Sequence, residues 1–311
     1  MARRRIGQEE FRFGGTLRRA NSLDEIAGLV DWAEIDGHLK PIYASERGEQ
    51  AWPPLAMMKA LLLSIWYDLS DVKLAEALDD RASFRRFCGF ASDEPTPERT
   101  AFVRFRRELV ARLLDRVLFE AVTRQLDCKN VMVKTGTLID ATVIASASKA
   151  KDEEARWVKH RRKPSVHGYK AHVATDGDGG IVREIEMTPA NVNDGKMLGE
   201  VLPENPGAVY ADLAYASRAN ETLIHAAGGQ SRLPGRGVWG GEEALRKLEA
   251  WNEEVGRIRR RIEKVFGTWK RSYGLRRMRW IGLARAGLQV RLTAIAFNLT
   301  RTRNILRERM A

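Results

Sequence analysis

The spacing of apolar positions divides the chain into a helical first part and a mixed second part. Apolar residues recur at helical intervals through most of the first 125 residues. Proline, serine and threonine at the starts of these runs are typical of helix N-termini. The predicted helices run from Ser22 to about Ile35, from Pro53 and Pro54 through LAMMKALLLSIWYDL, from Ser70 or Asp71 to Leu78, and from Thr96 and Pro97 to about Leu126.

The short helix, turn and helix between residues 54 and 78 fit two interpretations. They could form a DNA-reading module or part of a plain helical bundle, and the pattern favours neither. Residues 1 to about 20 are polar and predict a poorly ordered arm before the first helix.

From about residue 130 the period changes, and β-rich runs alternate with helical segments. The runs VKTGTLIDATVIAS, SVHGYKAHVATD and IVREIEMTP predict three strands, and the turn DGDGG joins the last two. A helix from about Asp194 to Leu202, the strand AVYADLAY and further helices follow. This order predicts an α/β domain with a mixed sheet and flanking helices over residues 126–311. An all-helical domain over residues 1–125 precedes it.

Residues 257–271, RIRRRIEKVFGTWKR, predict one amphipathic helix with three faces. At about 100° per residue, Arg259 and Lys270 fall beside Glu263 on one polar stripe. An adjacent apolar stripe indicates packing against a core, and the rest of the surface is basic. The apolar stripe contains Val255, Ile258, Ile262, Phe266 and Trp269, and the basic arc contains Arg257, Arg260, Arg261, Lys264 and Arg271.

The net charge of +12 is concentrated near the C-terminus, where residues 251–311 carry 16 Lys and Arg against 4 Asp and Glu. A basic segment on an otherwise neutral protein indicates a polyanion, most often nucleic acid. A membrane partner is the competitor, but no apolar run reaches the roughly 20 residues of a spanning helix. The start of the chain lacks the apolar core of a signal peptide. Cys88 and Cys128 lack the spacing of disulfide or zinc sites, so we expect a reducing cytoplasm.

Two carboxylates stand where the pattern predicts a core, and a third, Glu263, stands beside the core face of a late helix. Asp140 lies inside TLIDATVI, which predicts a buried strand, and Asp212 lies near the end of AVYADLAY. Burying a carboxylate costs several kcal/mol unless it is paired or binds a metal. With Glu263 these acids form the oxygen-only set that Mg²⁺ prefers, and two such ions suit phosphoryl transfer. The competing explanation for each aspartate is a strand-end turn or a partner for a buried Arg.

Other polar residues of this region have simpler explanations. Asp194 is expected to cap the helix that follows it. Asp176 and Asp178 belong to a turn, because residue 187, where a calcium loop needs Glu, is Met. Tyr169 and Lys170 either touch DNA or form an edge of the sheet, and the pattern favours neither.

Several motifs, taken in order, resemble one family. IDAT with Asp140, HGYKAH, TPANVND, YADLAY with Asp212, and R-x3-E-x6-K at Arg259, Glu263 and Lys270 resemble the DDE transposases of bacterial insertion sequences. The likeness is strongest to the group conventionally numbered five. It covers most of the chain, since LLLSIWYDLSDVKLAEAL, FRRFCGF and TAFVRFRREL are similar to that group's helical N-terminal domain, and the C-terminal tail is similar as well.

The resemblance implies that residues 1–125 form a helical domain for DNA binding or dimerisation and that residues 126–311 form the RNase H-like catalytic domain with basic C-terminal helices. In that core, Asp140, Asp212 and Glu263 are expected to bind two Mg²⁺ ions, with Mn²⁺ as a substitute. The resemblance also implies cleavage at the terminal inverted repeats of an element and strand transfer to target DNA, both double-stranded. Joining two ends requires at least a homodimer on DNA, and we expect a nucleoid-associated protein without a membrane partner. The expected DNA-binding residues are Arg259, Lys270, Lys170, Tyr169, Arg260, Lys264 and Arg271.

One departure from the family pattern concerns the position three residues before Arg259. The family has an aromatic residue there, and this chain has Gly256, so no side chain is available to stack on a base. The motif therefore does not predict a hairpin step at the element end. Two other functions stay open: a structure-selective nuclease that cuts without joining, and a catalytically silent DNA-binding protein descended from a transposase.

Overall fold

The computed structural model describes residues 21–42, 51–132, 134–159 and 164–311, and the arm predicted for residues 1–20 lies outside these ranges. The chain forms two compact units. A helical unit comprises residues 1–129 and 291–311, and a sheet unit comprises residues 130–290. The last helix, α12 (Leu283–Met310), therefore begins in the sheet unit and continues in the helical unit, whereas the sequence pattern placed all of it with the sheet.

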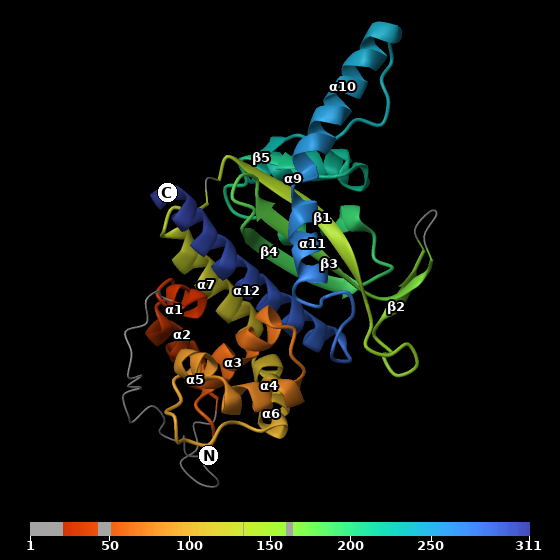
Figure 1. Ribbon diagram of the computed structural model, residues 1–311. Helices are drawn as coiled ribbons and strands as arrows, with labels where there is room; N and C mark the ends of the chain where they lie inside the picture. The colour runs from red at the N-terminus through yellow and green to blue at the C-terminus, as the bar shows by residue number, and fades with distance from the viewer. Residues whose placement is uncertain (1–20, 43–50, 133, 160–163) are drawn as a thin grey trace. The chain divides into compact units, whose positions relative to one another are not determined.

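The N-terminal part of the helical unit is built from seven helices within the described ranges, consistent with the predicted all-helical region (Figure 1). The apolar run after Pro53 forms a helix that is buried on almost every side. The next helix begins after Ser70, whose side-chain oxygen accepts a hydrogen bond from the Lys73 backbone N–H at 3.3 Å. The seven are α1 (Ser22–Ala27), α2 (Trp32–Leu39), α3 (Pro54–Trp66), α4 (Asp71–Asp80), α5 (Ala82–Cys88), α6 (Arg99–Ala111) and α7 (Leu114–Asp127).

The helix predicted from Ser22 to about Ile35 is in fact two helices, α1 and α2. Asn21 forms the capping box of α1, because its side chain accepts a hydrogen bond from the Leu23 N–H at 3.3 Å and its own N–H donates to the Asp24 carboxylate at 3.1 Å. A separate cap, Asp31, starts α2. The two caps fix two helix starts within a segment where apolar spacing alone predicted one.

The long helix predicted from Thr96 and Pro97 to about Leu126 is also divided. It begins at Arg99, with Glu98 as the N-cap residue, and it breaks at Leu113. Leu113 has a φ of 54°, in the left-handed region, so the helical hydrogen-bond ladder cannot continue through it. The two parts are α6 and α7.

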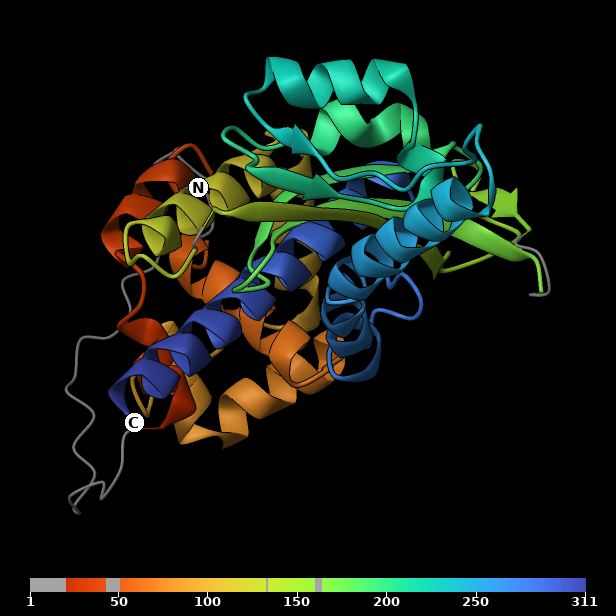
Figure 2. The same cartoon turned by 90° about the horizontal axis from the view of Figure 1, so that it is seen from above.

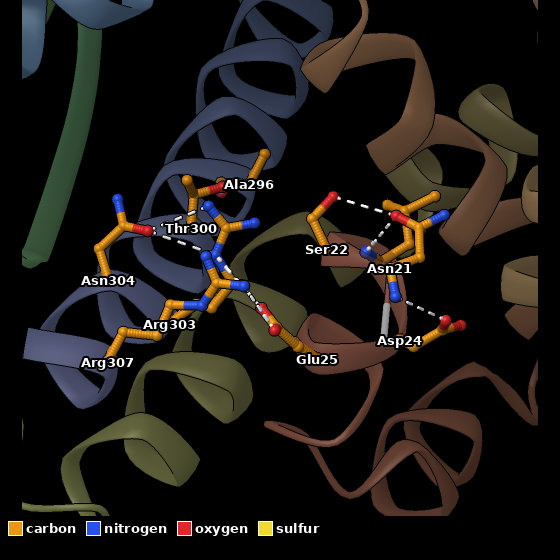
Figure 3. A network of polar contacts seen from close by, with 10 residues as sticks. Asn21, Ser22, Asp24, Glu25, Ala296, Thr300, Arg303, Asn304 and Arg307 are labelled. Carbon is orange, nitrogen blue, oxygen red and sulfur yellow. Dashed lines mark hydrogen bonds and ion pairs between the residues drawn. The ribbon is translucent and has the colours of Figure 1, made fainter. Parts of the chain in front are cut away.

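Several arginines of the C-terminal basic segment are used inside the helical unit. The Arg291 Nη1 atom lies 2.7 Å from Asp115 Oδ2, and both side chains are buried. Figure 3 shows Arg303 and Arg307 converging on Glu25, with Arg307 Nη2 2.5 Å from its carboxylate. Part of the cationic excess that indicated a polyanion therefore pairs with carboxylates of the protein itself.

The sheet unit contains a six-stranded mixed sheet, as predicted. The central strand β1 pairs antiparallel with β3 and parallel with β5, β3 pairs antiparallel with β4 and β2, and β5 pairs parallel with β6. The strands are β1 (Gly136–Ala145), β2 (Arg156–Val158), β3 (Val166–Asp176), β4 (Val182–Pro189), β5 (Ala208–Tyr210) and β6 (Gln230–Ser231).

The two faces of the sheet carry different helices (Figures 1 and 2). On one face, Ile139 of β1 belongs to an apolar core with residues of α8 (Leu198–Val201) and α9 (Arg218–Ala226). On the other, α10 (Glu242–Arg259) and α11 (Ile262–Arg271) contact β1. Because side chains alternate along a strand, Asp140 points away from the Ile139 core and toward the α10–α11 side. Two short 3₁₀ helices, Asp194–Met197 and Leu213–Tyr215, complete the connections.

The single helix predicted over residues 257–271 is broken between α10 and α11. The Arg261 N–H bonds the Ile258 carbonyl at 3.1 Å and the Glu263 N–H bonds the Arg260 carbonyl at 3.1 Å, so the chain tightens locally instead of continuing as one α-helix. The predicted apolar stripe is nevertheless buried at Val255, Ile262, Phe266 and Trp269. The break redirects the chain just before Glu263.

Candidate active site

Asp140 and Asp212 follow equivalent positions of two neighbouring parallel strands. Leu138 of β1 is paired with Tyr210 of β5, and each aspartate stands two residues further along its chain. Strand β5 ends at Tyr210, so Asp212 lies just beyond the strand predicted to contain it. Its Oδ1 atom accepts a hydrogen bond from the Ala214 N–H at 2.9 Å and begins the short helix Leu213–Tyr215.

Asp140 is an anion in a largely buried position, with only 15% of its side chain exposed. Burial raises its pKa to about 6, the Arg259 guanidinium acts in the opposite direction, and the carboxylates of Asp212 and Asp194 add to the increase. Its Oδ1 atom accepts a hydrogen bond from the Ala141 N–H at 2.8 Å. Asp140 therefore lies in the field of two further carboxylates, where a cation stabilises its charged form.

Arg259 supplies the cation in this structure. Its Nη1 atom lies 2.5 Å from Asp140 Oδ2, and its Nη2 atom lies 3.9 Å from Glu263 Oε1. Glu263 stands in the first turn of α11 and exposes 59% of its side chain. The Arg259 guanidinium thus lies between the carboxylate of Asp140 on β1 and that of Glu263 on α11. Arg259 and Asp140 are 119 positions apart in the sequence.

The carboxylates of Asp140, Asp212 and Glu263 are suitable ligands for a divalent metal. Mg²⁺ and Mn²⁺ favour oxygen ligands, and a nearby cation stabilises a buried anion. Among the described residues no three His, Cys, Asp or Glu side chains are already arranged around a common metal position. Arg259 contacts Asp140, and Glu263 faces solvent.

Asp194 is a residue whose place near the site the sequence analysis missed. Its predicted role as a helix cap is wrong, since Asn193 caps the short helix by accepting a hydrogen bond from the Gly195 N–H at 2.9 Å. Asp194 Oδ1 instead lies 2.7 Å from Lys170 Nζ and raises the pKa of Asp140. The sequence offered one signal for this pairing. Lys170 lies in the middle of the predicted strand β3, and a cation buried in a sheet needs an acidic partner.

Tyr169 and Lys170 do not meet the expectation that they touch DNA. The Tyr169 ring is fully buried and its hydroxyl donates a hydrogen bond to Asp152 at 2.5 Å. Lys170 is buried as well, and its ammonium donates to the Val192 carbonyl at 2.7 Å besides its pairing with Asp194. Both side chains hold the sheet unit together and are not available to a phosphate.

Tyr215 places a hydroxyl beside the carboxylates. Its side chain is completely buried, and its oxygen has no hydrogen-bond partner within the part of the chain that the structure describes. Burial raises its pKa first, and the charges of Asp194, Asp140 and Asp212 raise it further. The Tyr215 hydroxyl is therefore a neutral donor near the three aspartates, and it donates no hydrogen bond to any described residue.

The remaining cations predicted to contact DNA lie on or beside α11. Arg260, Lys264 and Arg271 are exposed, and Lys270 is partly buried. At Gly256, on α10, an added Cβ atom would meet nothing within 4 Å, so the helix surface there is open. Lys264 and Arg271 are exposed on the helix that carries Glu263, and Arg260 is exposed just before it.

Two family models match the chain. Residues 132–299 match the family model described as "Transposase DDE domain", and residues 12–108 match "Transposase domain (DUF772)". The first match spans more than half of the chain, and the chain belongs to the DDE transposase family. Together with the strand order, this membership confirms the predicted RNase H-like fold class.

Among solved structures the chain is similar to the "Mos1 transposase paired-end complex with left transposon end". The identity is 12%, the match covers 82% of this chain and 100% of that chain, and the TM-score is 0.22. At that TM-score the likeness carries no argument about the arrangement of the elements. Within the described ranges, the structure contains no helix with the length and apolar character that crossing a membrane requires.

Proposed function

We propose that this transposase belongs to the insertion-sequence group conventionally numbered five. It binds the terminal inverted repeats of its element, cuts the DNA at the element ends and transfers the strands to target DNA. The observation that carries the proposal is the Asp140–Arg259–Glu263 contact beside Asp212. In this contact, Asp140 of a strand and Glu263 of a helix lie beside the same cation, Arg259, in a domain of the DDE family.

Asp140, Asp212 and Glu263 are the residues that would hold divalent metal. Two bound Mg²⁺ ions, or Mn²⁺ in their place, would lower the pKa of the attacking water or 3′ hydroxyl and would neutralise the charge that builds on the phosphate. Asp140 must lose its proton to serve as a ligand, and its raised pKa makes this step sensitive to pH near 6. No covalent bond between protein and DNA is required.

The exposed cations of α11 position the DNA in this proposal. Arg260, Lys264 and Arg271 lie on solvent-facing positions of the segment that carries Glu263. Arg259 pairs with Asp140 in this structure and would contact a DNA phosphate once Asp140 held a metal. Its planar guanidinium suits both a carboxylate and a phosphate, because each accepts two parallel hydrogen bonds. A homodimer on DNA brings two ends to one target, in a nucleoid-associated complex.

Amide variants test the assignment, since they keep the shape of each ligand and remove its charge. Asp140→Asn, Asp212→Asn and Glu263→Gln should each retain binding to a duplex carrying the terminal repeat and lose cleavage in Mg²⁺. Full activity of any one of them would remove that residue from the metal site. Cutting without joining by the wild type would identify a structure-selective nuclease, and binding without cutting would identify a repurposed DNA-binding protein.

A further inference from the structure

We propose that the exposed face of α6, formed by Arg99, Arg104 and Arg107, binds the backbone of duplex DNA. This inference rests on the proposed function, and it assigns a second DNA surface to the helical unit. The sequence pattern left open which N-terminal helix meets DNA. In the structure, α6 differs from the neighbouring helices because its exposed arginines have no partner among the described residues.

The opposite face of α6 fixes the helix in the unit. Phe102, Phe105 and Leu109 are fully buried. Arg106 forms a two-pronged pair with Asp71 of α4, with Nη1–Oδ1 and Nη2–Oδ2 distances of 2.8 and 2.6 Å. These contacts hold α6 firmly and leave one face toward solvent.

That solvent face is cationic along its length. Arg99, Val103 and Arg107 recur at four-residue intervals, and Arg104 lies about 60° around the helix from Arg107. All four side chains are exposed. The helix has one carboxylate, Glu108, which lies about 100° from Arg107 and pairs with Arg112 at 3.3 Å. The face itself therefore carries three positive charges and no negative one.

Across the described residues, Arg99, Arg104 and Arg107 make no ion pair, side-chain hydrogen bond or ring contact. The neighbouring arginines of α4, α5 and α7 and of their connections do have such contacts. They are Arg81 with an aromatic ring, Arg85 and Arg86 with carbonyls or carboxylates, Arg112 with Glu108, Arg124 with Glu34, and Arg116. Three unpaired arginines on one helix face favour an anion that is not part of this chain.

The spacing of the three charges suits duplex DNA. Residues 99 and 107 are separated by about 12 Å along an α-helix, close to the roughly 12 Å width of the major groove. Thr100 and Val103 stand between the arginines, so the helix backbone can approach closely. Arginine binds phosphate oxygens through two donors, and a pair of arginines at the helix ends can reach phosphates on both sides of a groove.

The test compares full-length proteins by fluorescence anisotropy on a labelled duplex that carries the terminal inverted repeat. The variant is R99A/R104A/R107A. The matched control is R246A/K247A on α10, because those exposed cations already pair with Glu242 and Glu243 within their helix. We expect at least a tenfold loss of affinity for the α6 variant, and the slope of log K against log salt should fall by about 2.7 for three lost phosphate contacts. The control should bind as the wild type does.

Folding and alternative partners are resolved in the same experiment. Far-ultraviolet circular dichroism checks that the variant is folded, and R99K/R104K/R107K, which keeps the charges, should recover most of the affinity. Unchanged affinity and salt slope in the alanine variant would overturn the assignment of α6. A change in its mass by light scattering with unchanged DNA binding would also overturn it, and would identify a second protein copy as the partner. Failure of the wild type to bind the repeat would instead contradict the proposed function.

Discussion

The guanidinium of Arg259 lies 2.5 Å from the carboxylate of Asp140, so it neutralises one of the acids proposed to bind metal. The same guanidinium reaches Glu263 at 3.9 Å. In the proposed function, metal and Arg259 therefore compete for the Asp140 carboxylate. DNA that attracts Arg259 would favour metal binding, which couples the chemistry to the presence of the substrate.

Removing Arg259 should strengthen metal binding to the DNA-free protein. Arg259→Ala eliminates the competitor, so Mn²⁺ should bind several-fold more tightly in calorimetric titrations at pH 7. The metal-free variant should lose about 2 kcal/mol of unfolding free energy, because a buried carboxylate has lost its partner. Arg260→Ala, an exposed neighbour, is the control. Equal Mn²⁺ affinity in wild type and Arg259→Ala would show that the two cations do not compete.

The titration of Asp140 should appear in the pH dependence of stability. Its pKa rises from 3.8 to about 6 on folding, so the native state binds the extra proton and the free energy of unfolding falls as pH rises between about 4 and 6. With about 1.4 kcal/mol per pKa unit, this group alone accounts for up to about 3 kcal/mol. Asp140→Asn should lose that slope in urea unfolding with EDTA, while the exposed Asp178→Asn should keep it. An unchanged slope in Asp140→Asn would contradict the raised pKa.

Two tyrosines should respond oppositely to loss of the hydroxyl. The Tyr215 oxygen has no hydrogen-bond partner among described residues, so Tyr215→Phe should raise the free energy of unfolding by about 1 kcal/mol. The Tyr169 hydroxyl bonds Asp152, so Tyr169→Phe should lower the same quantity by about 1–2 kcal/mol. Chemical denaturation of the metal-free proteins measures both. Destabilisation of Tyr215→Phe would mean that its hydroxyl has an acceptor.

Two glycines should also differ. Gly256 lies within α10, where an added Cβ meets no atom within 4 Å, so Gly256→Ala should stabilise the protein by about 0.5–1 kcal/mol through helix propensity. Gly207 has a φ of 63° and an added Cβ would approach the Thr135 carbonyl oxygen to 2.6 Å, so Gly207→Ala should be destabilising. Melting temperatures decide between these outcomes. A loss of stability in Gly256→Ala would indicate that the helix surface there is covered.

The sequence singled out Asp140 and Asp212 as candidate ligands because each stood against its local apolar pattern, and Glu263 because it lay between two cations on one helix face. Asp140 interrupts an apolar strand, and the contact between Glu263 and Arg259 follows from helical spacing even though the helix breaks between them. Asp194 could not be assigned in this way. Asn193 beside it competes for the same cap, and the pairing with Lys170 joins residues 24 positions apart on different elements.

The helix boundaries were harder to predict for a related reason. Apolar spacing continues across Leu113 and across the break before Ile262, and no proline or glycine marks either break. The exposed arginines of α6 resemble paired ones in sequence, since Arg106 and Arg107 are adjacent and differ only in which face they occupy. An arginine that pairs with a distant carboxylate, as Arg106 does, differs from an unpaired one only in the folded structure.

Joining of DNA ends tests the central claim most directly. Wild type and Glu263→Gln are incubated with Mg²⁺ and labelled duplexes carrying the terminal inverted repeats, together with a target plasmid, and both cut and joined products are measured. We predict that the wild type alone cuts and joins, that EDTA abolishes both reactions, and that Glu263→Gln still binds the repeat. Joined products from Glu263→Gln at the wild-type rate would contradict the account.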